Sequence, residues 1–242
     1  MNITSFRDYL TDLLFPRRCP VCHGIVYPRG GLICPGCAGK LSFVKSPTCR
    51  MCGKEVLHER MEYCPDCLRR PKSFAGGMAL LNYSEAARAS VAKIKYKNKR
   101  EYLDFYGFAL AARYGERIRR LGADAMIPVP VHPSRRRARG FNQAEVLAGA
   151  VGRSLPFFLP VRNDILSRIR RTAPQKELTP AERLKNLSAA FAVTGDAAGL
   201  STVLLVDDIY TTGSTAEACA RLLLKAGVKK VYILVICIGQ GA

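Results

Sequence analysis

Runs of apolar residues of strand length recur along the last two-thirds of the chain, and segments with helical periodicity separate them. The run Val203–Val206 lacks polar alternation, which is typical of a strand buried on both faces of a parallel sheet. Helical patterns occupy residues 101–120 and start again at Thr179, where Pro180 and Glu182 complete a capping box. The alternation predicts an α/β domain whose strands are expected at residues 78–83, 125–131, 202–207 and 229–237.

Apolar residues also recur at helical spacing within residues 3–14 and predict a short amphipathic helix that packs on the fold. Charged residues interrupt this segment and no small-residue cleavage site follows it, so it does not match a secretory signal. No apolar run reaches the roughly 18 residues of a membrane-spanning helix. We therefore expect a cytoplasmic protein. Breaker residues at 69–77 divide it into an N-terminal module at 1–72 and an α/β domain at 75–242.

Polar residues directly after Val203–Val206 give this strand a candidate chemistry. Asp207 and Asp208 come where the strand is expected to end, at the sheet edge where parallel strands present ligands. A small hydroxylated loop follows before the next helical pattern, and it consists of Thr211, Thr212, Gly213, Ser214 and Thr215. Adjacent carboxylates bind paired hydroxyls or a hard cation, and such a loop before a helix binds phosphate. The segment therefore predicts a ligand that carries both a diol and a phosphate.

An apolar strand followed by two acids also describes a Walker B strand or a phosphoacceptor pocket. Neither requires the hydroxylated loop, and the chain has no GxxxxGK[ST] sequence to accompany a Walker B strand. The segment instead resembles the phosphoribosyl pyrophosphate (PRPP) motif of the type I phosphoribosyltransferases. That resemblance implies that Asp207 and Asp208 hold the ribose 2′ and 3′ hydroxyls and that Thr211–Thr215 surround the 5′-phosphate. Mg²⁺ is expected with the ligand, because a hard cation neutralises the pyrophosphate charge.

Eight of the ten cysteines form four Cys-x-x-Cys pairs near the start of the chain, and the pattern repeats after 30 residues. Four thiolates complete the tetrahedral shell of a structural zinc ion, so eight predict two zinc sites. A disulfide framework is the alternative, which no export signal supports. Pairing across the repeat is a second alternative. We favour sequential pairing, with one site made of Cys19, Cys22, Cys34 and Cys37 and the other of Cys49, Cys52, Cys64 and Cys67.

The chain has a formal charge of +19, and residues 88–185 contribute 22 basic against 8 acidic residues. This excess favours a polyanionic partner such as nucleic acid, although a solvated surface without a partner has the same composition. One basic segment, at 93–100, includes Tyr96, whose ring suits a stacked base of single-stranded DNA. The other is expected as a basic loop at 132–140. Candidate DNA contacts are Lys93, Lys95, Lys97, Arg135, Arg136 and Arg137.

Further motifs extend the resemblance over almost the whole chain. Arg139, Gly140 and Phe141 match the RGF of the pyrophosphate loop in adenine-type phosphoribosyltransferases. Three motifs follow the cysteine pairs along the chain, namely IPVPVHPxRxxxRGFNQAxxLA, TxPQxxLTxxERxxNLxxAF and VLLVDDIYTTGST. In this order they resemble the ComF family (ComFC and the GntX-like proteins). The resemblance implies a type I phosphoribosyltransferase-like parallel-sheet domain preceded by a small zinc-ribbon domain. Its second cysteine quartet departs from family members that have a single zinc site.

The resemblance implies a protein that binds PRPP and single-stranded DNA and acts in the uptake or processing of foreign DNA, alongside proteins of the DNA-uptake machinery. If it is an enzyme, it transfers the phosphoribosyl group from PRPP and releases pyrophosphate. One alternative is a nucleobase-salvage phosphoribosyltransferase. Such an enzyme requires a closed pocket that recognises the nucleobase, and no segment of the sequence predicts one. Another is a PRPP-sensing or DNA-binding module without turnover. His132, at a strand end, suits a structural role better than acid–base catalysis.

Overall fold

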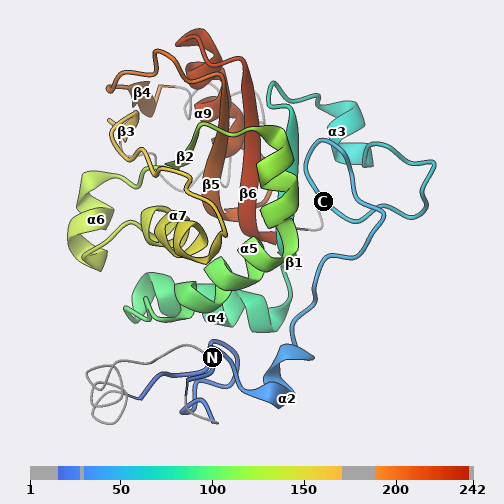
Figure 1. Ribbon diagram of the computed structural model, residues 1–242, viewed down its shortest axis with the longest axis vertical. Helices are drawn as coiled ribbons and strands as arrows, with labels where there is room; N and C mark the ends of the chain where they lie inside the picture. Colours follow the sequence, from blue (N-terminus) through green and yellow to red (C-terminus); the bar gives the residue numbers. More distant parts are fainter. Residues whose placement is uncertain (1–15, 28–29, 171–188, 240–242) are drawn as a thin grey trace.

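The computed structural model describes residues 16–27, 30–170 and 189–239, with a parallel sheet at its centre (Figure 1). The expected N-terminal helix and the capping box at Thr179 lie outside the described residues. Four strands are hydrogen-bonded in parallel, in the order β1 (Gly76–Asn82), β6 (Lys230–Ile238), β5 (Thr202–Tyr210) and β2 (Ala125–Pro128). All four strand predictions are confirmed, with differences in length.

The expectation that β5 ends at its two acids is wrong. β5 continues to Tyr210 because β6 extends as far as Ile238 and pairs with β5 along this whole length. On the other side of β5, the ladder with β2 stops at Pro128, opposite Val206, although the apolar pattern continues to residue 131. Proline lacks the backbone donor that a ladder needs, and a second proline follows at position 130. The acids therefore lie inside β5, beyond the end of its pairing with β2.

Both faces of the sheet are buried, as the unbroken apolar run predicts. Alternate side chains of β5 pack with helix α9 (Ser214–Lys225) on one face. The intervening side chains pack on the opposite face with a group of helices that Figure 1 shows in front of the sheet. This group consists of α4 (Glu85–Tyr96), α5 (Tyr102–Leu121) and α7 (Gln143–Ser154). Ser84 caps α4, with its hydroxyl accepting from the N–H of Ala87 at 3.4 Å.

The basic segment after β2 is a helix and not the expected loop. Helix α6 spans Pro133–Arg139, with the His132 side chain accepting a hydrogen bond from the Ser134 N–H at 3.2 Å. Gly140 ends the helix in the left-handed conformation, with a φ of 78°. None of the α6 side chains is buried, so the helix has no apolar stripe from which its sequence pattern could be recognised. A small antiparallel pair, β3 (Leu166–Arg168) and β4 (Phe191–Val193), completes the domain.

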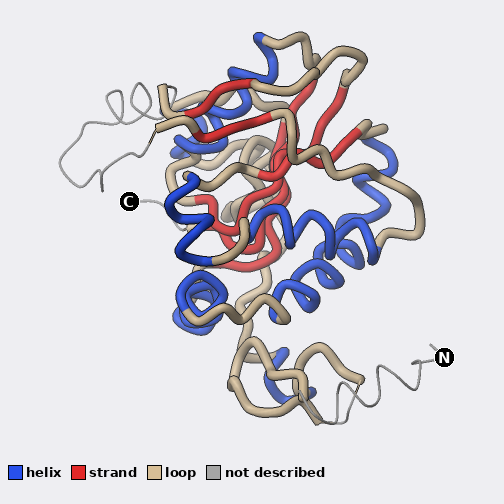
Figure 2. Tube along the Cα trace, turned by 90° about the vertical axis from the view of Figure 1, so that its left-hand side faces the viewer, coloured by secondary structure: helices blue, strands red, loops and turns tan. Residues whose placement is uncertain are grey.

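The two cysteine modules are attached to the α/β domain in different ways. The first, which contains α2 (Pro35–Ala38), forms the lobe at the bottom of Figure 2. It contacts α5 through an ion pair between Arg17 and Asp104 at 3.1 Å and through His23, whose Nδ1 lies 3.1 Å from the Tyr102 hydroxyl.

No helix in the described part of the chain has the length and apolar character needed to cross a bilayer.

The second module, which contains α3 (Pro65–Arg69), packs into the main core. Its four cysteines belong to the same buried cluster as Phe74, Ala79 of β1 and the α9 face of the sheet. Gly77 permits this contact, since a Cβ there would lie 2.6 Å from the carbonyl oxygen of Cys52. The chain between the modules also pairs with β1, where Val44 donates to Leu80 at 3.0 Å. The second module is therefore continuous with the core of the α/β domain.

Candidate functional site

The loop between β5 and α9 has a backbone conformation that requires glycine at one position. Gly213 caps α9 with a φ of 74°, and a Cβ at this position would collide with the Tyr210 hydroxyl. Thr211 and Thr212 are exposed, and the Thr212 hydroxyl lies 2.9 Å from that of Ser214. The free N–H groups at the start of the 12-residue helix and these hydroxyls suit an anion.

A cavity of about 280 Å³ opens beside this loop. All five residues of the loop line it, namely Thr211, Thr212, Gly213, Ser214 and Thr215. Asp207 contributes a carboxylate to the wall, and neighbouring apolar side chains such as Val129 and Val235 form the rest. The cavity therefore presents one acid and one phosphate-type loop to the same ligand. We call it the loop cavity.

Asp208 does not line the loop cavity, although the sequence suggests that the two acids act side by side. Because β5 continues through both acids, their side chains leave the strand toward opposite faces. Asp208 is 5% exposed, and its carboxylate forms an ion pair with the ammonium of Lys95, in the last turn of α4. The amide of Gln143 also donates to Asp208, at 3.5 Å. In this structure Asp208 faces α4 and α7.

The two acids have opposite pKa shifts. Burial, together with the neighbouring charge of Asp208, raises the pKa of Asp207 well above that of an ordinary carboxyl group. Burial also opposes the ionisation of Asp208, but the Lys95 ammonium and the surrounding hydrogen bonds outweigh it and hold the pKa of Asp208 below its ordinary value. The pair is thus set to retain a proton on Asp207 while Asp208 stays ionised.

Gln143 connects the acid pair to the RGF motif. Its Oε1 accepts a hydrogen bond from Arg139 at 3.0 Å, while its Nε2 donates to Asp208. Gln143 is 5% exposed and is the first residue of α7, where Asn142 caps the helix. Gln143 falls within the RGFNQA stretch of the family resemblance, but nothing in its sequence position indicates a contact with Asp208. A chain of polar contacts therefore runs from Arg139 through Gln143 to Asp208.

The three residues of the RGF motif have different environments. Arg139 ends α6, and its guanidinium lies 5.5 Å from the ring centre of Tyr96. Gly140 has a φ of 78°, a left-handed conformation that favours glycine. Phe141 is buried, and Arg100 lies 4.5 Å above its ring. Arg139 and Gly140 are thus available to an anion, whereas the Phe141 side chain belongs to the core.

The candidate DNA contacts divide into a surface group and one internal residue. Lys95 is internal, since its ammonium is paired with Asp208 and its side chain is 19% exposed. The other five lie at the end of α4 and on α6. Arg139 of α6 lies against the ring of Tyr96 of α4, and this contact connects the two helices. We call these five, together with Tyr96, the basic surface; its cations are Lys93, Lys97, Arg135, Arg136 and Arg137. Tyr96 is 72% exposed, so its ring is accessible.

Arg168, at the end of β3, is a further cation near the acids that the sequence did not single out. Burial lowers the pKa of its guanidinium, the charge of Arg135 adds to this, and the charge of Asp207 acts in the opposite direction. The guanidinium also lies 5.1 Å from the ring centre of Phe191. The β3–β4 pair thus brings a second arginine toward the side of β5 that carries Asp207.

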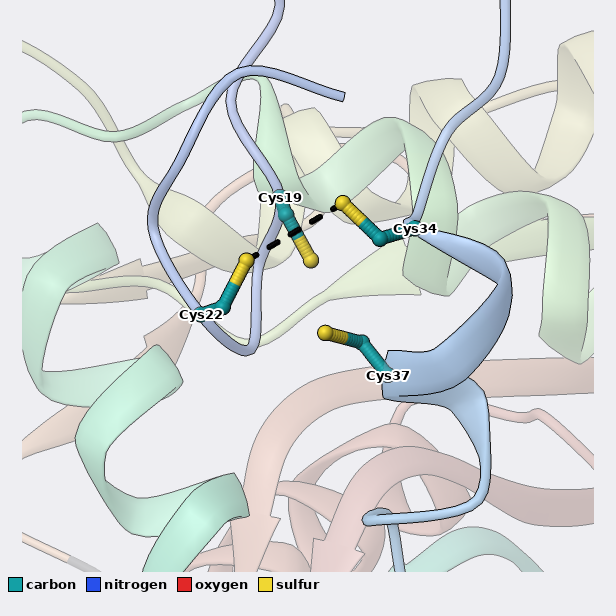
Figure 3. A group of neighbouring side chains, drawn as sticks. All are labelled: Cys19, Cys22, Cys34 and Cys37. Carbon is teal, nitrogen blue, oxygen red and sulfur yellow. Dashed lines mark hydrogen bonds between the residues drawn. The ribbon is translucent and has the colours of Figure 1, made fainter. Parts of the chain in front are cut away.

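Both cysteine quartets converge, with the sequential pairing that the spacing favours. In each quartet the four sulfur atoms lie within 4.8 Å of one another. Figure 3 shows those of Cys19, Cys22, Cys34 and Cys37 facing a common centre. The sulfurs of Cys22 and Cys34 are 3.9 Å apart, and those of Cys52 and Cys64 are 3.7 Å apart. Tetrahedral zinc with Zn–S bonds of about 2.3 Å requires about 3.8 Å, so both quartets fit structural zinc.

Comparison with known proteins agrees with this geometry. A family model described as a double zinc ribbon domain matches residues 10–68, and one described as a phosphoribosyl transferase domain matches residues 142–241. The fold and its sites thus define the class of protein: a double zinc ribbon followed along the chain by a phosphoribosyltransferase-type parallel-sheet domain.

Individual relatives narrow this class to one family. The chain is 32% identical over 228 residues to Competence protein F of Haemophilus influenzae, which covers 90% of this chain and 96% of that protein. It is 27% identical over 228 residues to the DNA utilization protein YhgH of Escherichia coli K12, covering 93% of this chain and 98% of that protein. Competence protein ComFC of Bacillus subtilis is 24% identical over 205 residues, covering 81% and 79%. The chain belongs to the competence protein F (ComF) family.

Proposed function

We propose that this protein binds PRPP with Mg²⁺ in the loop cavity and single-stranded DNA on the basic surface. The observation that carries the first part is that one cavity joins Asp207 to the whole of Thr211–Thr215. The loop suits the 5′-phosphate, because its N–H groups and hydroxyls donate to phosphate oxygens. Asp207 suits a ribose hydroxyl, because a carboxyl oxygen accepts a hydrogen bond in the protonated as well as in the ionised form. The phosphoribosyl transferase family model over residues 142–241 supports the same ligand.

The pyrophosphate end of the ligand is assigned to Arg139 and Gly140. The Arg139 guanidinium offers a planar set of donors that matches phosphate oxygens. When Mg²⁺ is bound, it would neutralise part of the pyrophosphate charge. Asp208 would reach the second ribose hydroxyl only after Lys95 gives up its ion pair. We therefore propose that Asp207 is the first contact of the ribose and that Asp208 joins as the complex closes.

If the bound ligand reacts, the protein acts mainly by positioning and by charge. The bond between ribose C1 and the pyrophosphate oxygen breaks, pyrophosphate leaves with the bonding electrons, and a bond forms from C1 to the acceptor. The acceptor loses its proton to solvent. We propose that Arg139 stabilises the charge that develops on the leaving group.

The DNA part of the proposal rests on the basic surface and on the relatives. Lys93 and Lys97 lie within four residues of the exposed Tyr96. Arg139, which follows the other three arginines of α6, has its guanidinium 5.5 Å from the centre of this ring. Phosphates would contact the lysines and arginines, while a base would stack on the tyrosine. Competence and DNA utilization appear in the names of the relatives. We propose a cytoplasmic role in handling incoming single-stranded DNA next to the uptake machinery. We also propose domain boundaries along the sequence at 1–72 and 75–242, with the second cysteine module of the first segment packed into the core of the second.

A calorimetric titration tests the ligand assignment. We expect Asp207→Asn combined with Asp208→Asn to weaken PRPP·Mg²⁺ binding by at least about 100-fold, equivalent to about 2.7 kcal/mol. The matched control is Asp164→Asn with Asp196→Asn, since both of these acids are exposed and the same number of carboxyl groups is replaced. Zinc content and melting temperature report whether each variant is folded. Equal affinity in the two double variants would reject the ribose assignment.

A module that senses PRPP without turnover is the second candidate, and the position of Asp208 outside the loop cavity favours it. Measuring pyrophosphate release with different acceptors distinguishes transfer to DNA, nucleobase salvage and sensing without turnover. Release that depends on single-stranded DNA supports transfer to DNA, and release with a free nucleobase supports a salvage reaction. Tight binding without release for any acceptor supports sensing.

A further inference from the structure

A second cavity, of about 510 Å³, lies between the second zinc ribbon and the loop after β5. Thr211 and Thr212 line both cavities, so the two sites share the wall that these residues form. The ribbon side is formed by Cys52 and Cys67, by the cations of α3 and by the segment that follows it. A volume of this size falls within the usual range of small-molecule sites, about 300–1,000 Å³. We call it the ribbon cavity.

Four cations and a single acid line the ribbon cavity, namely Lys54, Arg69, Arg70, Lys72 and Asp66. The acid is already paired twice, with Lys54 at 2.7 Å and with Arg69 at 2.9 Å. Among the described residues, neither Arg70 nor Lys72 has an ion-pair partner within 4.0 Å. These two cations are therefore free to meet an anion in a cavity that also presents the hydroxyls of Thr211 and Thr212.

We infer that the ribbon cavity binds the phosphate of a nucleotide, beside the proposed PRPP site. Arg70 and Lys72 supply the positive charge and the hydrogen-bond donors for the phosphate. The aliphatic stems of the long cations provide apolar surface for the rest of the nucleotide. The free nucleotide and the terminal nucleotide of a single strand share this chemistry. The inference does not depend on PRPP binding, because Arg70 and Lys72 do not line the loop cavity.

The presence of Arg70 and Lys72 has a simpler explanation, and the test must distinguish it from nucleotide binding. A zinc ion with four thiolates carries a charge of about −2, and nearby cations offset it. In that case Arg70 and Lys72 stabilise the second ribbon and bind no ligand. The two explanations differ in outcome, since neutralising the cations would then lower zinc retention and stability without changing nucleotide binding.

The experiment uses the zinc-loaded full chain and two pairs of matched probes. The first pair is thymidine 5′-monophosphate and thymidine; the second is a short oligothymidylate with a 5′-phosphate and the same strand with a 5′-hydroxyl. Arg70→Gln with Lys72→Gln is compared with Lys229→Gln and Lys230→Gln. The control residues are exposed, lie at the opposite end of the sheet, at the start of β6, and carry the same charge.

We expect wild type and control to bind a phosphorylated probe, and the Arg70/Lys72 variant to bind it at least tenfold more weakly with zinc content and PRPP·Mg²⁺ affinity unchanged. Binding of the mononucleotide identifies a free nucleotide as the ligand. Binding restricted to the 5′-phosphorylated strand identifies a strand end. The inference is overturned if wild type binds none of the probes, if both variants bind equally, or if the Arg70/Lys72 variant loses zinc and both ligands together. Failure of PRPP binding alone leaves the comparison of the variants intact.

Discussion

Lys95 is a single residue whose position determines the charge of the acid pair. The sequence places it among cations expected to meet DNA, but its ammonium lies against Asp208 on the inner side of α4. Two neighbouring buried carboxylates disfavour full ionisation, and a cation beside one of them lowers its pKa. Lys95 therefore keeps Asp208 ionised while Asp207 retains its raised pKa.

We expect Lys95→Met to weaken PRPP·Mg²⁺ binding about tenfold at pH 7, since one pKa unit corresponds to about 1.4 kcal/mol. Without the cation, the pair holds its proton more tightly and accepts fewer hydrogen bonds from ribose. A raised carboxyl pKa means that ionisation is completed only at higher pH. The affinity of the variant should therefore recover as pH rises from 6 to 9, which calorimetry at each pH measures.

Lys97→Met is the matched control for this prediction, because Lys97 is exposed two residues further on and carries the same charge. Lys95→Arg retains the cation and should keep the wild-type pH dependence. An affinity of Lys95→Met equal to or higher than that of wild type at pH 7 contradicts the prediction. It would mean that the cost of breaking the Lys95–Asp208 ion pair on ligand binding outweighs the benefit of keeping Asp208 ionised.

At the scale of elements, β5, its loop and α9 follow from adjacent residues and were predictable. The apolar run, the small hydroxylated residues and the helix pattern are consecutive in the chain, so no long-range contact is needed to recognise them. The same holds for the cysteine quartets: their spacing predicts two four-cysteine sites, and the favoured sequential grouping is the one in which the sulfur atoms converge.

Features that depend on partners distant in sequence were not predictable. β5 passes beyond its acids because β6 pairs with it there, and this turns Asp208 toward Lys95. Helix α6 has no apolar stripe, so its arginines look like a loop. The ribbon cavity exists only because the second ribbon packs against the loop after β5. The course of β5 and the ribbon cavity require tertiary contacts that periodicity does not encode, whereas α6 was missed because it buries no side chain.

The second ribbon shares the main core, whereas the first has a cluster of its own around Cys19, Val26 and Cys37. We therefore expect loss of the second zinc site to destabilise the sheet. Cys52→Ser with Cys64→Ser should reduce the free energy of unfolding of the α/β domain by about 4 kcal/mol or more, the range typical of a lost metal. Hydrogen exchange of the β1 and β6 amides measures the effect.

The first ribbon supplies the matched control for this measurement. Cys22→Ser with Cys34→Ser removes the equivalent pair of ligands and should accelerate exchange in the N-terminal lobe while leaving β1 and β6 protected. Both variants should bind one zinc ion instead of two. Equal protection of the sheet in the two variants would contradict the view that the second ribbon belongs to the main core.

At the scale of the whole molecule, the proposed binding regions surround the end of β5. The loop cavity lies beside this end, the ribbon cavity shares Thr211 and Thr212 with it, and the basic surface is joined to the acid pair through α4 and Gln143. Arg139 contacts both Tyr96 of the basic surface and Gln143. A nucleic acid on the basic surface would therefore lie next to the proposed PRPP site, as transfer to DNA or sensing during DNA handling requires.

The basic surface predicts a specific dependence of DNA binding on salt. Each phosphate contact on single-stranded nucleic acid contributes about −0.7 to the slope of log affinity against log salt. Changing Arg135, Arg136 and Arg137 together to alanine should therefore weaken binding of an oligothymidylate and make the slope shallower by about 2. Arg117, Arg119 and Arg120 near the end of α5, changed in the same way, remove the same charge away from this surface. Fluorescence anisotropy between 50 and 300 mM salt measures both slopes, and equal slopes would mean that net charge and not this surface binds the DNA.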